Sequence, residues 1–227
     1  LESVASPGAG ACGGQFTANT MAMAYEVMGI SPIAAAMVPA QAPAKAEVAY
    51  ETGRLVMDVL ARGQRPSDII TRQSSGGSTN GVLHLLALAH EMGIDLPIDD
   101  FHHISERTPL LCDLKPGGQY VAVDLYEAGG VPLVLSRMNE AGLLHADQPT
   151  VTGGTVGQHA IEATETAGQK VVRPLSDPIK ATGGLAILRG NLAPDGCVVK
   201  LSGHERRLHV GPARVFEGEE EAMEAVE

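Results

Sequence analysis

The chain has 227 residues and a formal net charge of -11, from 27 acidic and 16 basic residues. This balance argues against a phosphate backbone as the main partner, because nucleic-acid-binding proteins usually carry a basic stripe. The longest apolar run, Val82 to Ala89, is far shorter than the roughly 20 residues that span a bilayer, so we expect no membrane partner. An aliphatic apolar fraction together with 27 glycines predicts an α/β chain with many tight turns.

Amphipathic spacing predicts helices along the first two thirds of the chain, at residues 18–28, 46–61, 79–92, 121–128 and 133–141. The helix over 79–92 is apolar on nearly every side, so we expect it to be buried. From about Lys170 the pattern changes to short β-like runs at 171–172, 185–188, 197–201 and 208–210. An acidic helix is expected from Glu219 to Glu227.

The change of pattern near Lys170 predicts a domain boundary, with the poorly apolar segment 162–169 as the link. Residues 1–168 are interpreted as the C-terminal part of an α/β domain. Residues 169–227 are interpreted as the start of a β-rich, β-barrel-like domain. Both ends look cut, since a glycine turn opens the chain without a preceding strand and the last helix has no C-cap glycine.

A glycine-rich turn, Gly8-Ala-Gly-Ala-Cys-Gly13, matches the G-x-G-x-x-G pattern of dinucleotide-binding proteins. We reject that interpretation, because the pattern needs a preceding strand and an acidic residue after a second strand. What remains is Cys12, a few residues before a helix N-terminus, where main-chain N–H groups and the helix dipole favour a thiolate. The residues alone leave both a functional and a buried structural cysteine open. With Cys112 and Cys197 so far along the chain, neither a disulfide framework nor a complete metal knuckle is indicated, and a reducing compartment is expected.

A second small-residue loop, Ser74 to Asn80 (SSGGSTN), precedes the helix expected over 79–92. Such a loop suits an anion held by main-chain N–H groups, although a serine-capped buried helix is the alternative interpretation. It has no P-loop lysine, which argues against an NTPase.

Other polar groups are interpreted as structural. The run with Asp99, Asp100, His102 and His103 is expected to be a solvated loop or helix start, and His84, His90 and Glu91 lack the H-E-x-x-H spacing of a zinc protease. Cys112 and Cys197 stand among apolar residues, which favours inert packing.

Taken together, these strings resemble the dihydroxy-acid and sugar-acid dehydratase family, also described as the dihydroxy-acid/6-phosphogluconate dehydratase family. The matching stretches, in family order, are Gly10 to Met21 (GACGGQFTANTM), Gly76 to Asn80 with Val82 to Leu86, Asp113 to Gly117, Glu127 to Pro132, Thr150 to Gly153, Arg173 to Pro178, Gly190 to Pro194 and Gly211 to Phe216. The GACGG form resembles the dihydroxy-acid branch.

The resemblance implies an iron-sulfur cluster held by three cysteines, with 2Fe-2S favoured over 4Fe-4S, and Mg2+ beside it. Cys12 matches the last of the three cysteines, and Thr17, Ser78, Thr79 and Asn80 are expected near a small dihydroxy-acid substrate. In the family reaction a base takes the C2 proton of a 2,3-dihydroxy carboxylate while the open iron takes the C3 hydroxyl, giving a 2-oxo acid for valine and isoleucine biosynthesis. The resemblance also implies a homodimer when full length, in the cytoplasm, or in the plastid or mitochondrial matrix of a eukaryote.

The family's other cluster cysteines and magnesium ligands belong to segments outside residues 1–227, and its base serine is expected beyond Glu227. We therefore expect no catalytic residue in this segment and no activity from the chain alone. A helix-length segment that the family has before Gly-Gly-Ser-Thr-Asn is also absent here, since only residues 73–75 follow Arg72. A sugar-acid (aldonate) dehydratase of the same family and a degenerate, non-catalytic module are the alternative hypotheses.

Overall fold

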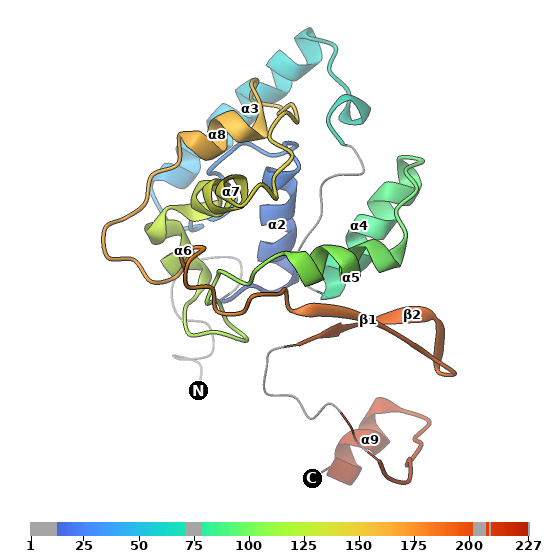
Figure 1. Cartoon of the computed structure of the whole chain (residues 1–227). Helices are drawn as coiled ribbons and strands as arrows, with labels where there is room; N and C mark the ends of the chain where they lie inside the picture. The colour runs from blue at the N-terminus through green and yellow to red at the C-terminus, as the bar shows by residue number, and fades with distance from the viewer. Residues whose placement is uncertain (1–12, 71–78, 202–207, 209, 227) are drawn as a thin grey trace.

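The computed structural model describes residues 13–70, 79–201, 208 and 210–226. Helices α2 to α8 form a helical body, and a two-stranded sheet and a last helix follow it (Figure 1). In chain order the elements are α2 (Thr17–Val27), α3 (Ala44–Ala61), the 3-10 turn η1 (Pro66–Asp68), α4 (Thr79–Glu91), α5 (Ile98–Arg107), α6 (Ala122–Ala128), α7 (Gly130–Glu140), α8 (Val156–Ile161), β1 (Leu185–Gly190), β2 (Ala193–Lys200) and α9 (Glu219–Val226). This mixture of helices and a small sheet is compatible with the α/β class.

The helices expected from amphipathic spacing are confirmed, with ends that differ by no more than three residues. The acidic helix at the end of the chain is confirmed as α9 up to Val226, while its expected last residue, Glu227, lies outside the described residues. The helix α5 confirms the interpretation of its acidic pair as a helix start, because Asp99 and Asp100 lie in its first turn, where the helix dipole favours negative charge.

The short helix α8 was not expected from the sequence. It begins with a capping box, in which the Thr155 hydroxyl accepts from the N–H of Gln158 and the Gln158 side chain accepts from the N–H of Thr155. These two reciprocal bonds satisfy main-chain donors that a helix start leaves without partners, so the helix begins at a defined residue.

Two apolar clusters form the core, and α2 contributes to both. The first gathers α6, α7 and α8 around Leu125, Leu135 and Val156. The second packs Met21 and Ala24 of α2 against Val82 and Leu85 of α4, with Phe101 of α5. The expectation that α4 is buried on nearly every side is wrong for one face, since Leu83 is 62% exposed.

The strands β1 and β2 pair antiparallel, with Leu185 opposite Lys200 and a register shift between Leu188 and Gly190. Leu185, Ile187 and Val198 pack on the second apolar cluster, which seats the hairpin against the helical body. Cys197 on β2 is exposed, so inert packing was the wrong expectation for it. In the described ranges this hairpin is the one sheet, so the β-barrel-like second domain stays a prediction.

The segment that was expected to link two domains is held against the helical body. Thr166 donates from its hydroxyl to the carbonyl of Glu127, at 2.6 Å, and Arg137 pairs with Glu165 at 2.6 Å. Val171 and Val172 belong to the first apolar cluster. The boundary after residue 168 stays a prediction.

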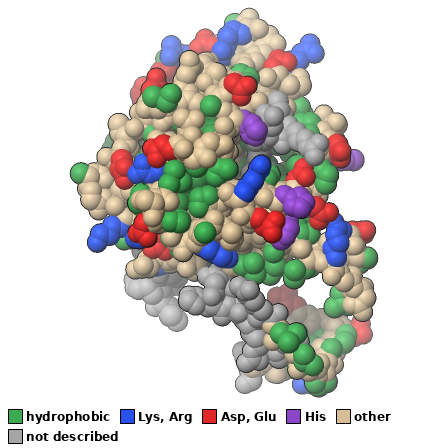
Figure 2. Space-filling model, viewed as in Figure 1, with side chains coloured by type: hydrophobic (Ala, Val, Ile, Leu, Met, Phe, Trp, Pro, Cys, Tyr) green, Lys and Arg blue, Asp and Glu red, His purple; other side chains and the backbone are tan. Residues whose placement is uncertain are grey.

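Charge and hydropathy on the surface agree with the composition. On the face shown in Figure 2, Lys and Arg side chains are scattered among Asp and Glu and do not gather in one patch. Among the helices of the described ranges, none combines the length and the apolar character that crossing a membrane requires.

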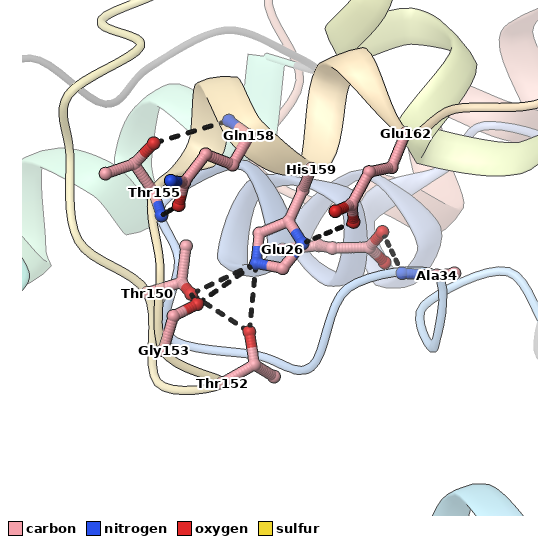
Figure 3. Close-up of polar contacts among 9 residues, drawn as sticks. All are labelled: Glu26, Ala34, Thr150, Thr152, Gly153, Thr155, Gln158, His159 and Glu162. Atoms are coloured by element: carbon pink, nitrogen blue, oxygen red, sulfur yellow. Dashed lines mark hydrogen bonds and ion pairs between the residues drawn. The ribbon is translucent and has the colours of Figure 1, made fainter.

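A buried carboxylate, Glu26, organises the loop that follows α2. The side chain is fully buried, and its two oxygens accept hydrogen bonds from the main-chain N–H groups of Ala34, at 2.6 Å, and Ala36, at 2.9 Å (Figure 3). Ala34 has a φ of 64°, a left-handed conformation that is uncommon outside glycine. Burial raises the pKa of Glu26 to about 7, and the two N–H bonds oppose that rise only in part.

We predict that the stability of the chain falls as the pH rises from 5 to 8. In the unfolded chain Glu26 ionises near pH 4.5, whereas in the fold its pKa is about 7. The stabilising contribution of the proton is therefore complete below pH 4.5 and is lost as the pH passes 7, which amounts to ~3 kcal/mol. Denaturant unfolding at several pH values measures it.

The matched variant is Glu26→Gln, which cannot titrate. It keeps one acceptor but turns an NH2 group toward the second N–H, so its stability is lower at acidic pH. Its free energy of unfolding is expected to depend less on pH than that of the unmodified chain. Equal slopes in the two proteins would contradict the assignment to Glu26.

Candidate functional site

The start of α2 lies against the loop that contains Lys115. The N–H of Gln15 donates to the carbonyl of Lys115 at 2.7 Å, and the buried Asn19 amide donates to the carbonyl of Gly14 at 2.7 Å. A Cβ on Gly14 would stand only 2.8 Å from the Lys115 oxygen, so this contact requires glycine. The Lys115 loop is itself closed by a bond from its N–H to the carbonyl of Tyr120, at 2.8 Å. Two stretches that carried the family resemblance, Gly10–Met21 and Asp113–Gly117, therefore meet here.

A third such stretch reaches the same place through Asn80. Its side-chain amide donates to the hydroxyl of Thr17 at 2.9 Å, although the two residues are 63 apart in sequence. Figure 1 shows α2 and α4 starting close to each other. Of the residues expected near the substrate, the structure thus brings together Thr17 and Asn80. Cys12 and Ser78 lie outside the described residues, and only the main chain of Thr79 is described.

The catalytic base has no counterpart among the residues that meet at this site. The family resemblance puts the base serine beyond Glu227, and Glu227 itself lies outside the described residues. The expectation that this segment holds no catalytic residue therefore stays a prediction, and so does the position of the serine.

The geometry at Thr17 suits binding of an oxygen-rich anion. Because the Thr17 oxygen accepts from Asn80, its own O–H is available to another acceptor. No side chain caps α2, since Phe16 stands at the N-cap position, so main-chain N–H groups of its first turn carry the positive end of the helix dipole. A carboxylate placed here would meet a hydroxyl donor and main-chain donors together.

Ligands for a metal ion or a cluster are not gathered in the described part of the chain. There, no three His, Cys, Asp or Glu side chains lie in a group that fits a metal ion. Cys112 lines a largely apolar cavity of about 370 Å³, and burial raises the pKa of its thiol to about 12, so it stays protonated. This confirms inert packing for Cys112. The described residues therefore do not by themselves fit a cluster or Mg2+.

A second polar cluster closes the turn at residues 150–154. Figure 3 shows the His159 ring pointing at this turn, with Nε2 3.2 Å from both the Thr152 hydroxyl and the Gly153 carbonyl. Its Nδ1 lies 3.8 Å from Glu162. The Thr150 hydroxyl donates to the Gly153 carbonyl at 2.8 Å, which leaves its proton engaged in the turn. The bonds run within the turn and its own helix, so the cluster is structural.

Sequence reasoning missed two of the groups that shape the site. Asn19 and the carbonyl of Lys115 hold the glycine turn, yet no spacing rule relates Gly14 to a residue a hundred positions away. Glu26 offered a signal that was available, because it is the one charged residue between Glu2 and Lys45. A single charge in so long an apolar stretch favours a buried, hydrogen-bonded role.

Comparison with known protein families gives two matches. The N-terminal domain of the dihydroxy-acid/6-phosphogluconate dehydratases matches residues 1–159, and the C-terminal domain of the same family matches residues 170–227. Two domains of one family thus account for nearly the whole chain. The chain belongs to the dihydroxy-acid/6-phosphogluconate dehydratase family.

Individual relatives narrow the likeness. A protein named dihydroxy-acid dehydratase from Koribacter versatilis is 61% identical and is covered to 41% by the whole chain. Proteins of the same name from Roseiflexus sp. and Thermus thermophilus are 55% and 50% identical, with 42% and 43% of their lengths covered. The chain therefore spans about two fifths of these relatives. The alignment with the first runs over 237 residues, more than the chain has, so that relative carries residues that this chain lacks.

We predict that Gly14→Ala opens the contact with the Lys115 loop. The added methyl meets a carbonyl oxygen that a hydrogen bond already fixes, so we expect a loss of about 1–3 kcal/mol in unfolding free energy. Hydrogen exchange should quicken at the Gln15 N–H, which donates to that carbonyl. Gly190→Ala is the control, because nothing lies within 4 Å of its Cβ position. Unchanged exchange at Gln15 in the Gly14 variant would count against the contact.

Proposed function

We propose that this chain is part of a dihydroxy-acid dehydratase, a hydro-lyase that converts 2,3-dihydroxy carboxylates of the 2,3-dihydroxy-3-methylbutanoate type to 2-oxo acids for branched-chain amino-acid biosynthesis. The observation that supports it most is the 61% identity to a protein of that name over the whole chain. The convergence of three family stretches at the start of α2 gives the proposal a place in the fold.

The proposed role of the described residues is to bind and orient the substrate. The first turn of α2 supplies main-chain N–H groups for a carboxylate, and Thr17 supplies a hydroxyl proton that Asn80 leaves free. Both side chains are uncharged, so they fix an oxygen atom without changing the protonation of the substrate. Proton removal from C2 is assigned to none of them.

The cofactor proposal stays with Cys12 as a ligand of an iron-sulfur cluster, 2Fe-2S in preference to 4Fe-4S, with Mg2+ as a second cofactor. A cluster with an open iron would supply a Lewis acid for the departing hydroxide. Because the described residues offer no complete ligand set, no reaction step is derived through either group. A cytoplasmic location and a β-rich second domain are parts of the same proposal.

Two alternatives have distinct support. An aldonate dehydratase belongs to the same family, but the three relatives compared above are all named for dihydroxy acids. A non-catalytic module is favoured by one observation, which is that the alignment is longer than the chain and residues present in a relative are missing. The experiments below separate them.

We predict that a chimera will dehydrate 2,3-dihydroxy-3-methylbutanoate, when this chain replaces the aligned part of the Koribacter versatilis relative. Formation of the 2-oxo acid is measured, with an aldonate as the competing substrate. Thr17→Val is expected to lower kcat/KM by about 10- to 100-fold, because a substrate oxygen loses a donor. Ser31→Ala, outside the site, is the control. A correctly folded chimera without activity would favour the non-catalytic module, and preference for the aldonate would favour the sugar-acid branch.

A second prediction concerns the chain alone. After anaerobic reconstitution with iron and sulfide, we expect less than one cluster per chain and no turnover, since Cys12 would be the single thiolate of a set of three. Cys12→Ser should remove whatever iron is bound, while Cys112→Ser should not, because the Cys112 thiol is buried and protonated. A stoichiometric cluster on the unmodified chain would overturn this ligand assignment.

A further inference from the structure

The helix α3 is long and yet buries nothing. It runs over eighteen residues, and none of its side chains is buried. A bond of 2.7 Å from the Arg62 guanidinium to the carbonyl of Val151 ties its end to the helical body, and a cavity of about 450 Å³ lies between its inner side and residues 32–35. Helices in proteins owe most of their stability to packing of an apolar face. The outer face of α3 therefore needs a partner.

That outer face is apolar from end to end. Seven positions at helical spacing form one stripe, which we call the α3 stripe: Ala46, Ala49, Tyr50, Gly53, Val56, Met57 and Leu60. All seven are exposed, and the four large side chains are between 53% and 69% exposed. No charged residue interrupts the stripe, because Glu47, Arg54 and Asp58 lie beside it along the helix.

Gly53 has no explanation inside the chain. It stands in the helix interior, where glycine is unfavourable relative to alanine, and its φ is not in the left-handed region. Nothing lies within 4 Å of the position that its Cβ would take. A glycine that no neighbour in the chain requires is what a close approach from outside would need.

The stripe is symmetric about Gly53. Stepping three, four and seven residues from Gly53 in either direction always leads to another member of the stripe, and Ala46 and Ala49 on one side correspond to Leu60 and Met57 on the other. An antiparallel copy of the helix would therefore place small residues against large ones, with glycine against glycine at the crossing. Self-complementarity of this kind is the property of a two-fold interface between identical chains.

We propose that the α3 stripe is an interface at which two copies of this chain pair through antiparallel α3 helices that cross at Gly53. The four large side chains expose on the order of 500 Å² per copy, which is as large as the biggest apolar patch of a typical monomer. Two copies would bury about twice that area before neighbouring residues are counted, which reaches the lower range of specific interfaces. The pairing does not depend on the proposed catalytic function, and its test needs no turnover.

Sedimentation equilibrium of the 227-residue chain over a wide concentration range tests the proposal. We expect a monomer–dimer equilibrium that Met57→Lys weakens by about 100-fold or more, because it places a charge at the centre of the stripe. Ile161→Lys is the matched control, since Ile161 is also an exposed apolar helical residue, at 77%, but lies on α8. It should leave the equilibrium unchanged.

Gly53→Ala gives a sharper result, because its two effects have opposite signs. A methyl at an open helical position should raise the thermal midpoint of the monomer. Across the crossing, the two added methyls should weaken pairing by about tenfold. Pairing that is unaffected by both α3 variants would overturn the proposal, and so would a chain that remains monomeric at every concentration, as expected if another partner covers the stripe.

Discussion

The hydrogen bond from Gln15 to the carbonyl of Lys115, made across a glycine that has no room for a Cβ, is the constraint on which the rest of the structure depends. It sets where α2 begins. Since α2 contributes side chains to both apolar clusters, its position determines how α4 and α5 pack on one side and how α7 packs on the other. The same contact brings the family's glycine-rich stretch to the start of α4, where Asn80 reaches Thr17.

The far end of α2 is held in a different way, by a carboxylate that burial would otherwise penalise. Two main-chain N–H groups lie within hydrogen-bonding distance of Glu26 and offset part of the cost of removing it from water. The raised pKa of Glu26 shows that the offset is incomplete. What the chain gains is a defined path for residues 31–44, which turn through the left-handed Ala34 and lead into α3. Stability near neutral pH is exchanged for the placement of that helix.

Family membership and the lone helix α3 have to be considered together. A relative carries residues that this chain lacks, and the chain covers about two fifths of each relative compared. In such a chain, an apolar helix face without a partner in the described residues has two explanations, which are a surface for another copy and a surface for some other protein segment. The symmetry of the α3 stripe about Gly53 favours the first, because a surface shaped for an unrelated segment has no reason to be self-complementary.

The sequence by itself determined the family, the helices with strong 3.6-residue spacing and the β-hairpin, because these features reside in consecutive residues. It predicted Thr17 and Asn80 as neighbours of one substrate only through resemblance, and it missed α8, whose six residues are too few for a periodic pattern. Only the tertiary structure decided that Gln15 meets Lys115, that Glu26 is buried, that Cys197 is exposed while Cys112 is not, and that α3 is uncovered. The reason is physical: burial and long-range hydrogen bonds depend on which distant segments pack together, and no local spacing encodes that choice.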